Sequence, residues 1–214
     1  MQPKHPESTK KSQGARWLPF ILGLALGALV ILAVRFATYM PERVHYHANF
    51  AVYLNGQQYT FDKPVYYQPV SICSSDKGIT IPQQRAHMHD NKGGVVHVHD
   101  HAVTWGQLFE NLGWYVGPDF VETDDGTMYK ASGDAKLHIL LNDQDYTDLS
   151  PITDMVITDK ARLLVSFGTI DDATLQQEYK TVANSAAHYD TSKDPASCAS
   201  AESVTLRERL HHLL

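Results

Sequence analysis

Residues 45–63, HYHANFAVYLNGQQYTFDK, contain the alternating pattern that decides the fold. Their first half places apolar side chains at every second position: Tyr46, Ala48, Phe50, Val52 and Leu54. This period of two is typical of a β-strand with one buried face. Asn55-Gly56 is the preferred pair for a two-residue turn, so we expect a β-hairpin. Its apolar face is expected to pack on a helix, while its other face carries His45 and His47.

The elements that follow the hairpin predict a mixed α+β domain. Thr104 and Gln107 form a capping box that opens a helix ending at Gly113, and Gly106 within it is expected to allow close packing against the sheet. Strands are predicted at 95–101, 136–141 and 161–167, a turn at Asp125-Gly126, helical segments at 172–187 and 204–214, and a loop at 189–203. Residues 64–94, broken by Pro and Gly, are expected to form a long functional insertion.

Seven histidines occur between residues 45 and 101 in three groups with the spacing H-x-H. They are His45 and His47, then His87 and His89, then His97, His99 and His101. On an extended chain this spacing sends both imidazoles to the same side, and imidazole is the commonest transition-metal ligand near neutral pH. A single pair is typical of an exposed strand, but three pairs in one domain favour a metal site.

The donor set favours zinc or copper as the bound divalent transition metal. Asp90 and Asp100 are expected either to bind the ion directly or to orient an imidazole through its second nitrogen. Met88 alternates away from the histidines, and a site poor in Cys and Met argues against Cu(I). Seven candidate ligands exceed the four of one tetrahedral ion, so either two ions or one ion with supporting residues is expected.

Cys73 and Cys198 are the two cysteines of the chain. In an oxidising compartment they are expected to form one disulfide. The alternatives are free thiols, or Cys73 as a further metal ligand.

Residues 17–34, WLPFILGLALGALVILAV, carry no charge and are long enough to cross a bilayer. Basic side chains precede them at Lys4, Lys10, Lys11 and Arg16, which predicts a cytoplasmic N-terminus and an exported remainder. A cleaved signal peptide is the competing interpretation. Gly23 and Gly27 have the spacing of helix pairs in membranes, so a homodimer or another membrane partner is considered, although in a segment rich in Gly and Ala chance explains the motif better.

After residue 40 the chain has 13 basic and 23 acidic side chains. An acidic domain without a basic stripe argues against nucleic-acid binding. We expect a cytoplasmic basic tail at 1–16, a transmembrane anchor at 17–39, a metal-binding domain at 44–168 with an insertion at 64–94, and a helical or disordered tail at 169–214. This arrangement corresponds to a single-pass protein of the cell membrane with an extracytoplasmic domain.

The order hairpin, helix, strand, turn and final strand, ending in LHILLNDQDYTDLSPITDMVITDKARLLVSFG, resembles the β-grasp (ubiquitin-like) fold over residues 44–168. The repeated H-x-H motifs and T-x-G-Q-x-F-x-x-L-G, carried by Thr104, Gly106, Gln107, Phe109, Leu112 and Gly113, also resemble a group of uncharacterised single-pass membrane proteins of bacteria and archaea. The first resemblance implies a sheet with one open face. The second implies a folded domain without naming a reaction.

Three functions remain open from the sequence. The first is a membrane-anchored domain that captures or senses a divalent ion, or uses it structurally. The second is a metal-dependent hydrolytic or oxidative enzyme that uses the same histidines, with a carboxylate such as Asp90 or Asp100 in place of the absent Glu. The third is a metal-free interaction module whose imidazoles titrate near neutral pH.

Overall fold

The computed structural model describes residues 14–39, 44–69, 72, 81–147, 152–190, 204 and 206–213. The chain divides into two compact units, one formed by Met1–Glu42 with Glu202–Leu214 and the other by Arg43–Ala201. Cys73 and Cys198, and with them the expected disulfide, lie outside the described residues.

The first unit contains the apolar helix α1 (Gly14–Thr38) and the short helix α5 (Leu206–His211). Residues Trp17–Thr38 of α1 have a mean hydropathy of 2.5 and are long enough to cross a membrane. Arg209 of α5 donates a hydrogen bond to the Ala37 carbonyl, and the ring of His212 stacks on Tyr39 at 4.2 Å. These contacts join the C-terminal helix to the end of α1 within this unit.

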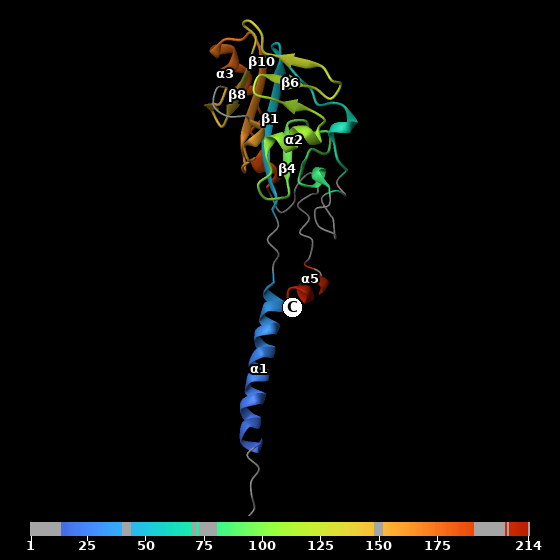
Figure 1. The fold of residues 1–214 in the computed structure, drawn as a ribbon, viewed down its shortest axis with the longest axis vertical. Coiled ribbons are helices and arrows are strands. Elements are labelled where there is room, and N and C mark those ends of the chain that lie inside the picture. The colour runs from blue at the N-terminus through green and yellow to red at the C-terminus, as the bar shows by residue number, and fades with distance from the viewer. Residues whose placement is uncertain are drawn as a thin grey trace, which may run out of the picture. The chain divides into compact units, whose positions relative to one another are not determined.

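The second unit is built on a mixed sheet in which the strand order is β3-β4-β1-β10-β8-β9, with β2 paired to β1 (Figure 1). The strands are β1 (Tyr46–Leu54), β2 (Gln57–Gln58), β3 (Ala86–His87), β4 (Val95–Val98), β8 (Lys136–Leu141), β9 (Gln144–Asp145) and β10 (Arg162–Gly168). Strand β1 lies at the centre, antiparallel to β4 and parallel to β10. The predicted α+β class and the predicted strands at 136–141 and 161–167 are confirmed.

The hairpin turn forms at Asn55-Gly56, where both residues have positive φ as a type I′ turn requires. Strand β2 is only two residues long, however, because Tyr59 onward leaves the sheet. Most of the pairing of β1 is therefore with β4 and β10, and the centre of the sheet is made by long-range contacts.

One face of the sheet packs against helix α2 (Trp105–Asn111). Phe50 of β1 contacts the rings of Trp105 and Phe109, and all three side chains are buried. The predicted capping box is present: Thr104 accepts a hydrogen bond from the Gln107 backbone, and the Gln107 side chain accepts one from the Thr104 backbone. A Cβ on Gly106 would lie 2.7 Å from the Thr153 carbonyl oxygen, so its close packing is against the 3-10 helix η4 (Ile152–Asp154) rather than the sheet.

The opposite face is covered by α3 (Asp172–Thr181) and α4 (Ala186–Tyr189). Leu175 and Tyr179 of α3 pack on Ala51 and Leu164 of the sheet, and Figure 1 shows α2 and α3 on opposite sides of the strands. The sheet face expected to be open is thus partly covered by the residues after Gly168. Tyr189, expected to begin a loop, is the last residue of α4 and is buried.

The predicted insertion 64–94 is described at residues 64–69, 72 and 81–94. Its described residues include the 3-10 helices η1 (Pro64–Tyr66) and η3 (Pro82–Gln84), after which β3 pairs with β4 at the edge of the sheet. A second sheet, β5 (Tyr115–Val116), β6 (Phe120–Glu122) and β7 (Met128–Lys130), follows α2 and was not predicted.

Candidate metal centre

Three neighbouring strands place a row of histidines on the face of the sheet away from α2. In the pairing register His47 of β1 lies opposite His97 of β4, and His97 lies opposite His87 of β3. Directly paired residues share a face of the sheet, because side chains alternate along each strand. The row is continuous across the strands because β4 lies between β1 and β3.

A tight turn brings His89 back to the same row. Asp90 and Asn91 both have positive φ, a conformation that Asp and Asn tolerate better than most residues, and Gly94 has a φ of 80°. A Cβ at Gly94 would lie 2.6 Å from the Phe50 carbonyl oxygen, so only glycine fits there. The turn places the His89 ring 3.8 Å from that of His97, measured between centroids.

Six imidazoles form one cluster, which we call the histidine cluster: His45, His47, His87, His89, His97 and His99. The rings of His45 and His99 are stacked at 4.7 Å, and those of His87 and His99 at 5.1 Å. The ring of His47 lies 4.4 Å from His97 and 4.7 Å from His45. All three H-x-H groups therefore contribute to a single site, as the sequence analysis required for metal binding.

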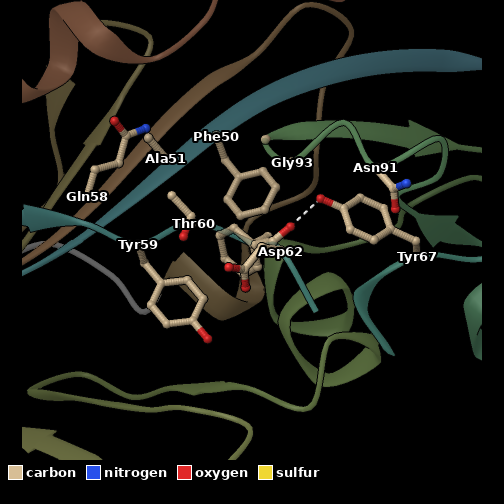
Figure 2. Close-up of a pocket in the computed structure, with 11 residues that line it drawn as sticks. Phe50, Ala51, Gln58, Tyr59, Thr60, Asp62, Tyr67, Asn91 and Gly93 are labelled. Carbon is tan, nitrogen blue, oxygen red and sulfur yellow. Dashed lines mark hydrogen bonds between the residues drawn. The ribbon is translucent and has the colours of Figure 1, made fainter. Parts of the chain in front are cut away.

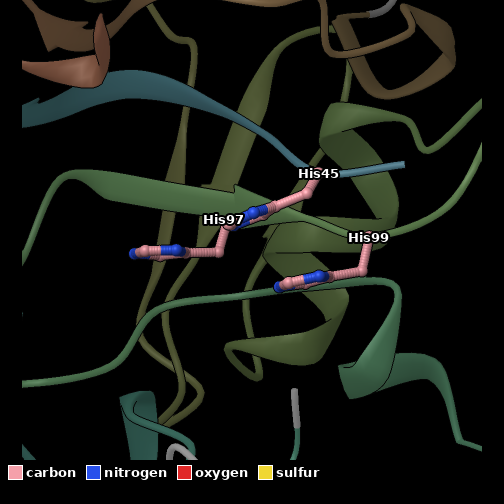
Figure 3. Close-up of side chains that lie close together, drawn as sticks. All are labelled: His45, His97 and His99. Atoms are coloured by element: carbon pink, nitrogen blue, oxygen red, sulfur yellow. The ribbon is translucent and has the colours of Figure 1, made fainter. Parts of the chain in front are cut away.

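Within the cluster, His45, His97 and His99 each offer a ring nitrogen within 4.8 Å of the other two, which is a separation that one metal ion can bridge. Figure 3 shows the three rings extending to the same side of the strands that carry them. His97 is buried, whereas His45 and His99 are half-buried. Nε2 of His99 is buried and has no hydrogen-bond partner among the described residues. A buried nitrogen in that state is what a metal ligand requires.

The other three histidines have an oxygen atom beside Nδ1. His47 Nδ1 lies 2.6 Å from Asp190 Oδ1, and His87 Nδ1 lies 2.7 Å from the Gln83 carbonyl oxygen. His89 Nδ1 lies 3.4 Å from Asp90 Oδ2. Metal-ligating histidines commonly donate their second N–H to such an oxygen, which fixes the ring and its tautomer.

Burial keeps the imidazoles of His87, His97 and His99 neutral. Loss of solvent, together with the neighbouring histidines, lowers the pKa of His87 to about 4 and that of His99 to about 2. The same two causes lower the pKa of His97. Neutral imidazole is the form that binds a metal ion, so no proton has to be displaced from these rings at neutral pH.

Two of the predicted ligands do not join the cluster. His101 is exposed in the turn after β4. Asp100 accepts a hydrogen bond from Arg85 Nε at 2.7 Å, and it is held there as an ion pair. Asp90 lies beside Nδ1 of His89, where it would orient this imidazole, one of the two roles expected for it.

The sequence analysis missed two residues that contact the histidine cluster: Tyr189, the last residue of α4, and Asp190, which follows it. Asp190 contacts His47 and also pairs with Lys160, whose Nζ lies 3.0 Å from Asp190 Oδ2. The ring of Tyr189 lies 5.6 Å from His47 and 5.8 Å from His97. Their stretch of sequence is rich in Ser, Asp and Ala and has no clear periodicity, so no local signal marks them.

A pocket of about 380 Å³ lies elsewhere in the same unit, beside Phe50, Tyr59, Tyr67 and Asn91 (Figure 2). The Tyr67 hydroxyl donates a hydrogen bond to the Phe61 carbonyl at its wall. No member of the histidine cluster is among the described residues that line this pocket. The pocket and the histidine cluster are therefore separate features.

Comparisons of the chain with protein-family models, with curated proteins and with solved structures gave no match. The interpretation of the site consequently rests on its own geometry.

Proposed function

We propose that this chain is a membrane-anchored protein whose extracytoplasmic domain binds a divalent transition metal, zinc or copper, for capture, sensing or structural use. The observation that carries the proposal is the group His45, His97 and His99, whose nitrogens lie within 4.8 Å of one another. The lowered pKa values of His97 and His99 support it, because both rings are neutral ligands at physiological pH.

The chemistry of the cluster supports zinc or copper(II) over copper(I). The neighbouring side chains are imidazoles and carboxylates, which suit borderline divalent ions. Met88 is fully buried in the core on the α2 side of the sheet, so its thioether belongs to the packing there. The Met88 sulfur is therefore not a ligand of the proposed metal site.

Membrane anchoring is supported by α1, a helix of 25 residues whose apolar span is exposed along its length. The basic residues before it favour a cytoplasmic N-terminus, which directs the metal-binding domain to the other side. We further propose a β-grasp fold for residues 44–168. The order β4-β1-β10-β8-β9, with the two chain-terminal strands parallel at the centre and α2 across one face, supports that assignment.

A metal-dependent enzyme is the second candidate, and one observation favours it. His45 and His99 are half-buried, so an ion held with His97 would have a side that substrate or water can reach. Three histidines with an open position are a known catalytic zinc arrangement. A metal-free module that titrates near neutral pH is less well supported, because burial lowers the pKa of His87 to about 4.

Metal analysis of the detergent-solubilised full chain tests the proposal. The untagged protein is loaded with Zn²⁺, freed of excess metal and measured by elemental analysis, together with His97→Ala and the matched control His101→Ala. We expect stoichiometric zinc in the wild type and in His101→Ala. In His97→Ala the affinity should fall at least about 100-fold, which exceeds the usual effect of losing an outer partner. Zinc below stoichiometry in all three proteins would overturn the proposal.

A further inference from the structure

We infer that His47 and Asp190 are positioning residues of the proposed metal site. Together they fix the proton of the His97 ring on Nδ1, so that Nε2 is the atom by which His97 binds the ion. The inference rests on the proposed function, in which His97 is a ligand. It deepens that function because it assigns the ligating atom and ties the site to the residue that follows α4.

Asp190, His47 and His97 are joined in a chain of two hydrogen bonds. His47 Nδ1 lies 2.6 Å from Asp190 Oδ1, and His47 Nε2 lies 2.8 Å from His97 Nδ1. An imidazole has only two nitrogens, so both nitrogens of His47 are engaged in this chain. His47 therefore influences the ion through His97, in whose ring Nε2 is the nitrogen that the chain does not use.

The ligand role of His97 sets the positions of the protons along the chain. A nitrogen that binds a metal ion carries no proton, so the single proton of a neutral His97 ring is on Nδ1. Nδ1 of His97 is thus the donor, and Nε2 of His47 is the acceptor. The proton of the neutral His47 ring is then on Nδ1, where it faces Asp190.

The carboxylate at the other end of the chain requires the same arrangement. An ionised carboxylate can only accept hydrogen bonds, so Asp190 selects the form of His47 with a proton on Nδ1. The opposite arrangement, in which His47 donates from Nε2, would put the proton of His97 on Nε2 and block metal binding there. Asp190 disfavours this arrangement of neutral rings, because it would leave a lone pair of His47 facing the carboxylate.

The surroundings hold the chain in place. His47 and His97 lie directly opposite each other in the pairing of β1 with β4, and each is at most 1% exposed. Lys160 Nζ lies 3.0 Å from the second oxygen of Asp190, and the Lys160 backbone donates a hydrogen bond to the His47 carbonyl. Hydrogen bonds shielded from water are electrostatically stronger than those in water. The chain therefore also orients the His97 ring and makes its Nε2 a stronger ligand, as outer partners of metal ligands do.

The position of the His97 proton tests the inference directly. We label histidine with ¹⁵N in the full chain, solubilise it in detergent, load it with Zn²⁺ and record ¹H–¹⁵N NMR spectra. The His97 signals are identified by their absence from His97→Ala. We expect a proton on Nδ1 of His97 and a zinc-bound Nε2 without a proton. A proton on Nε2 in the zinc-loaded protein would overturn the inference and leave the proposed function standing, whereas no zinc binding would overturn both.

Zinc affinity separates positioning from packing alone. In a calorimetric titration, Asp190→Asn and His47→Leu should each lower the affinity about 10-fold to 100-fold. His47→Gln should recover most of the loss seen in His47→Leu, because the glutamine oxygen can accept the Nδ1–H of His97. Asp159→Asn is the matched control with wild-type affinity, because Asp159 pairs with the same Lys160. Wild-type affinity in both Asp190→Asn and His47→Leu, or equal losses in His47→Gln and His47→Leu, would contradict the inference.

Discussion

At the scale of single residues, His47 shows how the site is organised. Its ring is fully buried, with Asp190 on one nitrogen and His97 on the other. The His47 backbone also takes part, because its carbonyl accepts a hydrogen bond from the Lys160 backbone. The same lysine pairs with Asp190, so this corner connects a strand, a turn and the end of α4 through one histidine.

Acid is expected to destabilise the metal-free domain. Burial lowers the folded-state pKa of His87, His97 and His99 below the unfolded value of about 6.5. Their contribution to stability is therefore complete above pH 6.5 and is lost as the pH falls, toward about 4 for His87. Each histidine protonated only in the unfolded state costs about 1.4 kcal/mol per pH unit.

Urea unfolding of the metal-free full chain at pH 7.5 and pH 5.0 measures this effect. His87→Gln should flatten the pH dependence, and His101→Gln, at an exposed position, should leave it unchanged. Equal unfolding free energies for the wild type at the two pH values would contradict the expectation.

At the scale of elements, Asn49 is the link between the central strand and α4. Its side-chain oxygen accepts hydrogen bonds from the Ser185 and Ala186 backbone at 2.9 Å, and its Nδ2 donates to the Gly94 carbonyl. Asn49 is fully buried in a strand that is otherwise largely apolar. The residue thus sets both the start of α4 and the turn before β4, the two elements that frame the histidines.

Asn49→Ala should lower the free energy of unfolding by about 1–3 kcal/mol, because it leaves buried N–H groups without an acceptor. Zinc affinity should fall as well, since α4 precedes Asp190. Thermal denaturation and zinc titration of the full chain measure the two effects, and Gln57→Ala on exposed β2 is the control. A variant as stable as Gln57→Ala would show that α4 does not depend on this residue.

At the scale of the whole molecule, the proposed membrane attachment through α1 and the proposed metal binding by the sheet domain can be tested separately. The full chain should remain with membranes after alkaline carbonate extraction, because α1 carries an uncharged apolar span from Trp17 to Val34. A chain that lacks residues 1–40 should appear in the soluble fraction. Mature protein that begins near residue 40 by N-terminal sequencing would instead identify α1 as a cleaved signal sequence.

Local patterns predicted much of this architecture. The period of two in β1 and β8, the Asn-Gly turn and the capping box at Thr104 act within a few residues, so they can be read directly from sequence. The short strands β5, β6 and β7 were missed because two or three residues are too few for a period to emerge. The Asp90-Asn91 turn had a signal in its residue types, but it lay within a segment that was interpreted as an insertion.

The sequence by itself determined that three H-x-H groups exist and that each would present its rings on one side of an extended chain. The tertiary structure alone decided that the groups meet, because the β1, β3 and β4 register aligns His47, His97 and His87. It also decided that Asp190 and Tyr189 contact the histidine cluster. His101 is instead exposed to solvent, and Asp100 pairs with Arg85. The physical reason is that side-chain alternation is local, whereas strand pairing and helix docking depend on burial between distant segments.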